Sequence, residues 1–459
     1  MAGIGFELRK IYKKKTLFSA VTGTLYATMV VMGPAVIFIL ALLLIHVILR
    51  LNSATLAETD FFVSSFTYSF LIALLVSTPV SNVLSRYISD KIFEHRYEDI
   101  SASLLGSITL ITAVCGSIAA VLCYLLYTKD GVELSLLIPY YMLCILAGNM
   151  YNLMNYVSAL KEYLRVTFSF VAGFGLGAVI FLILYYGFHA DILNAVYYGV
   201  VIAVLFIDMF LIRECLCFFG KPGEKSFEYL QYFNKYPQLA IAGMAYMLGV
   251  FLTNLAYWYS SDFQLRVGIF RTAPLYDMAI FLALIINFPA LIIFVVKIET
   301  EFYEANVKYL SALNKGSYMM IESEKEAMEN TLKLQLFFVY NTQLMITVFL
   351  ICAIGVIFPY LGLASVTINM FMILGMGVYC TLCMYFTIVM LYYFSDYVSA
   401  CIGACTFLGI EILAILICGY LKEYFYPLPL LIAGICGWCI SFFLLRRRIK
   451  NLNRYLLSK

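Results

Sequence analysis

Charged residues are scarce in this chain of 459 residues. Asp, Glu, Lys and Arg make up 12% of it, while hydrophobic residues make up 63%. Soluble domains carry about 25% charged residues, and they have too little interior to bury so much apolar surface. The shortage of charge therefore excludes an ordinary soluble protein. It predicts an all-α integral membrane protein, because helices satisfy their own backbone hydrogen bonds in lipid.

Further absences narrow the function. The chain has no GxxxxGK[ST] motif and no soluble segment large enough for a nucleotide-binding domain, so transport would draw on an ion gradient, the membrane potential, a partner or polymerisation. The net charge of +3 gives no reason to expect a nucleic-acid partner. No His or acidic residue accompanies the CxxC pairs Cys380/Cys383 and Cys436/Cys439, which favours helix packing over metal or redox chemistry. We expect no catalytic residues, no cofactor and no metal.

Apolar blocks separated by short polar stretches predict twelve membrane-spanning helices, since about 20 residues suffice to cross a bilayer. Glycine and proline interrupt many of them, as membrane helices tolerate. The predicted spans are 18–49, 62–86, 101–127, 134–160, 165–187, 191–213, 237–260, 273–298, 335–358, 366–394, 397–420 and 428–446.

The chain opens with MAGIGFELRKIYKKKT, whose five basic residues precede a long apolar run. That run is too long for a signal peptide, whose apolar core is about 7–15 residues, so the opening is interpreted as the cytoplasmic flank of the first span. With the N-terminus inside, 25 of the 30 basic residues fall on the inner side. This asymmetry predicts a multi-pass protein of the cytoplasmic membrane with both termini cytoplasmic.

The spans divide into two groups of six. We expect an N-terminal six-helix bundle over 1–213, an inner linker over 214–236 and a C-terminal bundle over 237–459. Within the second bundle, 299–334 mixes charge with helical apolar spacing, which predicts a cytoplasmic helical hairpin. A docking site for a cytoplasmic partner is the alternative for this segment. The basic tail 446–459 is expected to be cytoplasmic.

Three acids lie within predicted spans, where an ionisable group costs about 2.5–3.5 kcal/mol on insertion scales. Asp208 has Arg213 nearby and Asp277 has Arg271 nearby, so a structural ion pair or interfacial solvation would explain each. Glu411 lies near the middle of its span without a local partner. Asp208 and Glu411 are the candidates for proton or cation coupling; for Glu411, a protonated or hydrogen-bonded buried carboxyl is the alternative.

Uncharged polar residues form stripes on the second, fourth and seventh spans. Any single stripe is explained by hydrogen bonding between helices. Three stripes together favour a polar lumen, and tyrosine and amide side chains suit a bulky, hydroxyl-rich solute. The lumen candidates are Tyr68, Thr78, Asn82, Arg86, Asn149, Asn152, Tyr156, Asn254, Tyr257, Arg266, Arg271, Asn287 and Tyr385.

The decapeptide MAGIGFELRK, followed by a basic patch and a first span broken at Gly33-Pro34, resembles the start of the PelG family. That family contains the membrane transporters of Pel exopolysaccharide systems, within the multidrug/oligosaccharidyl-lipid/polysaccharide (MOP) exporter superfamily. The resemblance implies a MOP/MATE-like fold of two six-helix bundles around a central cavity. It also implies export of an exopolysaccharide involved in biofilm formation, with a cytoplasmic glycosyltransferase and other Pel-type membrane subunits as partners, beside the membrane lipid.

Two other transport functions stay open. An ion-coupled multidrug antiporter of the same superfamily often has an acid in the first span, but 18–49 contains none, so Glu411 would have to carry the coupling. A flippase for a lipid-linked oligosaccharide would favour a cationic lumen, for which only Arg86, Arg266 and Arg271 are candidates. A membrane enzyme fits less well, because acids are few in the predicted outer loops.

Overall fold

The computed structural model describes residues 17–52, 54–160, 163–260, 263–357, 364–420 and 425–457. Side chains are not described for a few further residues, most of them in 17–32. The opening decapeptide and its basic patch therefore lie outside the described residues.

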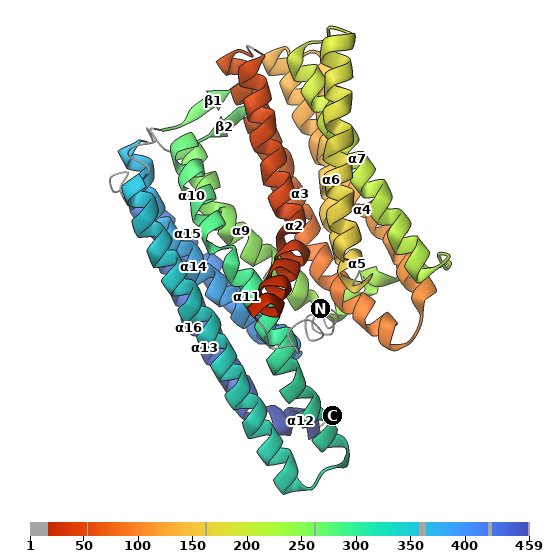
Figure 1. Cartoon of the computed structure of the whole chain (residues 1–459), viewed down its shortest axis with the longest axis vertical. Coiled ribbons are helices and arrows are strands. Elements are labelled where there is room, and N and C mark those ends of the chain that lie inside the picture. Colours follow the sequence, from red (N-terminus) through yellow and green to blue (C-terminus); the bar gives the residue numbers. More distant parts are fainter. Residues whose placement is uncertain are drawn as a thin grey trace. The chain divides into compact units, whose positions relative to one another are not determined.

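The described chain is almost entirely helical, which confirms the all-α membrane fold (Figure 1). Within it, eleven helices are long and apolar enough to cross a membrane, and Val36–Leu51 is a shorter apolar helix at the first predicted span. The elements of the first half are α2 (Leu17–Leu51), α3 (Leu56–Phe93), α4 (Tyr97–Asp130), α5 (Leu134–Leu160), α6 (Tyr163–Leu182), the π-helical turn η1 (Ile183–Gly187), α7 (Ile192–Phe219), η2 (Glu228–Leu230) and α8 (Gln231–Lys235).

The second half begins with α9 (Pro237–Ser260) and a short pair of strands, β1 (Leu265–Val267) and β2 (Phe270–Thr272). It continues with α10 (Pro274–Asn287), α11 (Pro289–Lys297), η3 (Ile298–Phe302), α12 (Tyr303–Lys315), α13 (Tyr318–Ile357), α14 (Ser365–Tyr393), α15 (Tyr397–Cys418), α16 (Leu428–Lys450) and α17 (Leu452–Leu457). The segment 299–334, expected as a helical hairpin, contains most of η3, all of α12 and the first part of α13.

Local sequence explains several helix ends. Thr55 and Glu58 form a capping box at the start of α3, satisfying backbone donors that the first turn leaves unpaired. Pro289 starts α11 directly after α10 ends, so the eighth predicted span, 273–298, consists of two helices. Proline lacks the N–H that a continuous helix would need at this point.

The helices pack into two compact units. Among the described residues, the N-terminal unit contains those of Met32–Met247 and Gln264–Thr272, and the C-terminal unit contains 17–31 and those of Leu248–Phe263 and Ala273–Lys459. Helix α9 therefore begins in one unit and ends in the other. The domain boundaries expected at 213 and 237 lie between predicted membrane spans. The two packed units are defined by contacts between residues, so they are a different kind of division.

The β1–β2 hairpin was not expected from the sequence. Its strands pair antiparallel with Val267 opposite Phe270, and Gly268 takes a left-handed φ of 58° in the turn. Phe270 is buried against the rings of Tyr68 and Tyr140, so the hairpin packs within the N-terminal unit. Strands of three residues are too short to show a period of two, so periodicity could not predict them.

An ionic cluster fixes the segment after α7 to the N-terminal unit. Lys91 at the end of α3 is only 3% exposed, and its Nζ lies 3.0 Å from Glu228 Oε1 and 3.2 Å from Asp99 Oδ2. Arg96 approaches the same Asp99 carboxylate at 2.7 Å. Lys91 therefore pairs with two carboxylates that come from α4 and η2, and Arg96 supplies a second positive charge.

We predict that Lys91→Met will destabilise the protein by about 3 kcal/mol, because removing one partner of a buried ion pair leaves unpaired charges behind. Thermal unfolding of the purified protein in detergent will measure the loss. The matched control is Lys333→Met, which breaks an exposed i,i+4 pair with Glu329 and is expected to cost about 0.5 kcal/mol or less. Equal melting temperatures for the two variants would contradict the role assigned to the cluster.

Candidate functional site: a buried carboxyl and a polar helix face

Glu411 lies on α15 and is completely buried within the C-terminal unit. Neither of its carboxylate oxygens has a hydrogen-bond partner among the described residues. An isolated charge is very costly in such surroundings unless it is protonated or paired. The site therefore favours a carboxyl that either carries a proton or holds a cation.

Several other polar groups in this region come from α9 and α10, and Tyr426 stacks on Tyr257. The hydroxyls of Tyr257 and Tyr276 lie close enough to interact electrostatically with Glu411, and their rings are 5.2 Å apart. Both hydroxyls are buried, as is the hydroxyl of Thr253, which lies next to that of Tyr276. The region thus has several hydrogen-bonding atoms available for a proton or an ion.

Asp277 anchors the edge of this region. Its carboxylate accepts hydrogen bonds from Asn254 Nδ2 at 2.8 Å, Trp258 Nε1 at 2.9 Å and the Ala273 backbone N–H at 3.1 Å. Three donors within the C-terminal unit therefore satisfy this carboxylate. The hydrogen bonds hold the end of α9 against the first turn of α10.

A glycine brings α9 close to Glu411. A Cβ added at Gly249 would lie 3.0 Å from Glu411 Oε2 and 2.3 Å from a ring carbon of the buried Phe407. Any larger residue at 249 would displace these side chains. Two of the residues predicted as lumen candidates, Asn254 and Tyr257, thus lie in the same region as the coupling candidate Glu411.

In the N-terminal unit, α3 carries a polar face. Thr78 and Asn82 are half-buried, and Asn82 Nδ2 donates to the Leu239 carbonyl at 3.3 Å. Arg86 is also half-buried and pairs with Asp90 at 2.8 Å. Ser85 is exposed on the same stretch of the helix. Gly243 of α9 lies against the side chains of Thr78 and Asn82, so the most accessible part of this face within its own unit is around Ser85.

The α5 stripe is bonded to α4 instead. Asn149 Nδ2 donates to Thr112 Oγ1 at 2.9 Å, and Asn152 Nδ2 donates to Ser107 Oγ at 2.8 Å. The hydroxyl of Tyr156 lies 3.2 Å from the Ser107 hydroxyl. All three predicted residues are buried, so the contacts support their role as hydrogen bonds between helices.

Asn287 is likewise buried at the end of α10. Its Nδ2 donates to the Gly375 carbonyl at 3.0 Å, and its Oδ1 accepts from Gln343 at 3.2 Å and from Thr347 at 2.9 Å. This amide joins α10, α13 and α14. Its partners supply the hydrogen bonds that lipid cannot.

Of the remaining candidates, Tyr68, Arg266 and Arg271 lie at the β-hairpin, and Tyr385 lies on α14. The Tyr68 hydroxyl donates to the Arg271 carbonyl at 2.9 Å, which fixes the β-hairpin on α3. Arg266 is exposed and its Nε donates to the Gly268 carbonyl at 3.3 Å. Tyr385 is half-buried on α14.

Asp208 is 3% exposed on α7, and both of its oxygens lack a hydrogen-bond partner among the described residues. No ion pair joins it to Arg213 in this part of the chain, although their spacing suggested one. Asp208 therefore resembles Glu411 in being a buried carboxyl without a described partner.

Comparisons with known proteins agree with this membrane fold. The family model "PelG: Putative exopolysaccharide Exporter (EPS-E)" matches residues 1–456. The chain belongs to the PelG family. By that family it is a transporter and not an enzyme. Among curated proteins, none matches this chain.

Several solved structures have the same fold. An outward-facing multidrug resistance MATE family transporter of the MOP superfamily matches with a TM-score of 0.64 at 14% identity, covering 94% of this chain and 96% of the other. The eukaryotic MATE transporter AtDTX14 matches with a TM-score of 0.59 at 13% identity, with the same coverage. A MOP superfamily transporter from Pyrococcus furiosus, described as having a binding pocket of reversed polarity, matches with a TM-score of 0.57 at 14% identity, again with 94% and 96% coverage. These likenesses confirm a MOP/MATE-like fold for this PelG family member.

We predict that Gly249→Ala will destabilise the protein by about 1–3 kcal/mol, because its Cβ must displace Phe407 and Glu411. The control is Gly409→Ala on α15, where an added Cβ meets nothing within 4 Å. There the substitution should be neutral or slightly stabilising, since alanine favours the helix. Melting temperatures in detergent compare the two variants, and a Gly249→Ala variant as stable as wild type would refute the close approach.

Proposed function

We propose that the protein exports an exopolysaccharide across the cytoplasmic membrane, and that the polymer passes along a polar path that includes the α3 face. The family match over residues 1–456 supports the class of substrate. The polar face of α3 is the structural observation that carries the path. Its serine, threonine, amide and guanidinium groups can exchange hydrogen bonds with sugar hydroxyls, which apolar helix faces cannot do.

The predicted lumen candidates contribute unequally to this proposal. Asn149, Asn152 and Asn287 already have protein partners, so they support the path by joining neighbouring helices within each bundle. Thr78, Asn82 and Arg86 also have protein partners, but they are only half-buried and are therefore the better candidates for contact with the polymer. Tyr68, Arg266 and Arg271 would act near the β-hairpin.

The asymmetry of basic residues supports an orientation with both termini in the cytoplasm. In that orientation, polymer from a cytoplasmic glycosyltransferase would enter at the end of α3 that carries Arg86 and Asp90. The other Pel-type membrane subunits are further partners in this proposal.

Glu411 is the proposed coupling residue. A buried carboxyl that gains and loses a proton, or exchanges it for a cation, can link an ion gradient to a conformational change. The buried carboxyl of Glu411 also favours the second candidate function, an ion-coupled antiporter of the same superfamily. A flippase for lipid diphosphates is less well supported, because Arg86 is paired with Asp90 and carries little free positive charge.

The path is tested in a strain that lacks this protein but keeps its cytoplasmic polymerase active. Wild-type protein should restore surface polysaccharide, and Ser85→Trp should reduce it at least tenfold by placing an indole on the α3 face. The control is Ser117→Trp at an exposed position of α4 outside this face, which should export normally. Surface polysaccharide in the deletion strain itself would refute polymer export, and normal export by Ser85→Trp would refute the path.

Glu411→Gln distinguishes a coupling role of the carboxyl from a structural one, because glutamine keeps the shape of the side chain and cannot ionise. If Glu411 couples export to an ion gradient, the variant should fold with a melting temperature near wild type and lose at least tenfold in export. The control Glu326→Gln changes an exposed carboxyl of α13 and should leave export unchanged. Full export by Glu411→Gln would reduce Glu411 to a structural residue, whereas drug efflux from vesicles without export would favour the antiporter.

A further inference from the structure

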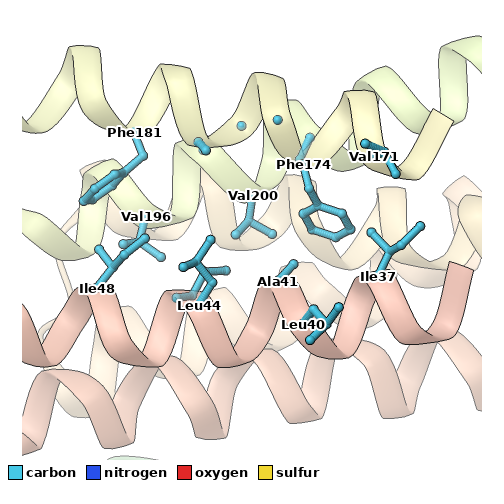
Figure 2. A pocket seen from close by; sticks show the side chains of 16 residues that line it. Ile37, Leu40, Ala41, Leu44, Ile48, Val171, Phe174, Phe181, Val196 and Val200 are labelled. Atoms are coloured by element: carbon cyan, nitrogen blue, oxygen red, sulfur yellow. The ribbon is translucent and has the colours of Figure 1, made fainter. Parts of the chain in front are cut away.

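A groove in the N-terminal unit has a different character from the polar α3 face. It has a volume of 310 Å³ and lies among α2, α6 and α7 (Figure 2). Side chains of Ile37 and Leu44 on α2, Phe174 and Phe181 on α6, and Val200 on α7 line it. Figure 2 shows the α2 and α6 side chains directed toward the space between the two helices.

The lining contains only apolar side chains and glycines. A sugar would lose its hydrogen bonds to water here and gain none from side chains, so the groove does not suit the polysaccharide. Apolar cavities also tend to stay dry, and an empty one leaves its lining atoms without dispersion partners. The chemistry therefore fits a hydrocarbon ligand.

The dimensions fit one half of a bilayer. Along α2 the groove runs from Ile37 to Ile48, which corresponds to about 16 Å of helix. The hydrocarbon core is about 30 Å thick, so this length is close to that of one leaflet. Leu40 and Leu44 are 59% and 55% exposed and leave the groove accessible from the surface of the unit.

Glycines shape the groove. At Gly177 an added Cβ would lie 2.5 Å from the Gly199 carbonyl oxygen, so α6 and α7 touch there. At Gly175, which also lines the groove, an added Cβ meets nothing within 4 Å. The helices are thus held close at one glycine while the other leaves open space beside α2.

We propose that this groove binds one acyl chain of a membrane phospholipid, which fills the space between α2 and the α6–α7 pair. The membrane supplies this occupant at high local concentration, and its hydrocarbon chain matches the groove in polarity and in length. The proposal does not rest on the substrate of export. It assigns a lipid site to an apolar surface distinct from both Glu411 and the α3 face.

The test uses the full-length protein in bilayer nanodiscs that contain a phospholipid with a photoactivatable acyl chain. After irradiation, peptide mass spectrometry should find labelling at the groove segments 37–48 and 171–181 at least fivefold above that on other exposed spans. Gly175→Ala should reduce the labelling of these segments slightly. Gly175→Leu and Gly175→Phe should reduce this labelling at least fivefold, because the leucine and phenylalanine side chains would occupy the groove.

The matched control is Gly409→Leu, which adds the same side chain at an exposed membrane-helix glycine with open space in the C-terminal unit. It should leave labelling of the groove unchanged. Uniform labelling of all exposed spans, or undiminished labelling in Gly175→Leu, would overturn the proposal. Displacement of the label by a polyprenyl phosphate, but not by an equal excess of unlabelled phospholipid, would also overturn it, because the occupant would then be a polyprenyl chain.

Discussion

Lipid provides no hydrogen-bond partners, and this constraint governs where the polar residues of this chain lie. Backbone groups satisfy one another within helices, and polar side chains in the membrane must find partners on neighbouring helices. Asn152 bonds to Ser107, and Asn287 bonds to groups on α13 and α14. Because most polar groups meet this requirement locally, the exceptions are informative. Among the described residues, Glu411, Asp208 and the accessible side of α3 are three places where polarity has no complete structural explanation.

Small residues control how closely the helices approach. Gly249 brings α9 against Phe407 and Glu411, and Gly177 brings α6 against α7. A single added methyl group would disturb either contact, since protein interiors are closely packed. Gly175 has the opposite effect because it leaves space open. The same residue type thus creates both the tight contact around the buried carboxyl and the apolar groove beside α2.

Much of the fold could be predicted from the sequence, because the membrane limits spans to long apolar helices. The structure has a helix over each predicted span, apart from the division of the eighth at Pro289. The β-hairpin was missed, since strands of three residues carry no usable pattern and Phe270 is buried only through distant residues such as Tyr140.

The candidate site was less predictable. Helix periodicity identified Asn254, Tyr257 and Glu411 as polar residues within spans. Their grouping with Thr253, Tyr276 and Asp277 depends on the packing of α9 and α10, which no spacing in the sequence encodes. Periodicity also could not separate the bonded amides of α5 from the accessible face of α3, because both form polar stripes. The difference arises from Ser107 and Thr112 on α4, whose positions relative to α5 appear only in the folded chain.

Transport by the purified protein alone tests most directly whether it moves polysaccharide by using an ion gradient. Vesicles containing it would be mixed with labelled oligosaccharides released from the host's own surface polymer, and oligosaccharide accumulation would be followed with an ion gradient imposed. The account predicts saturable accumulation that requires both the protein and the gradient. Gradient-driven movement of a hydrophobic cation with no movement of oligosaccharide would contradict it.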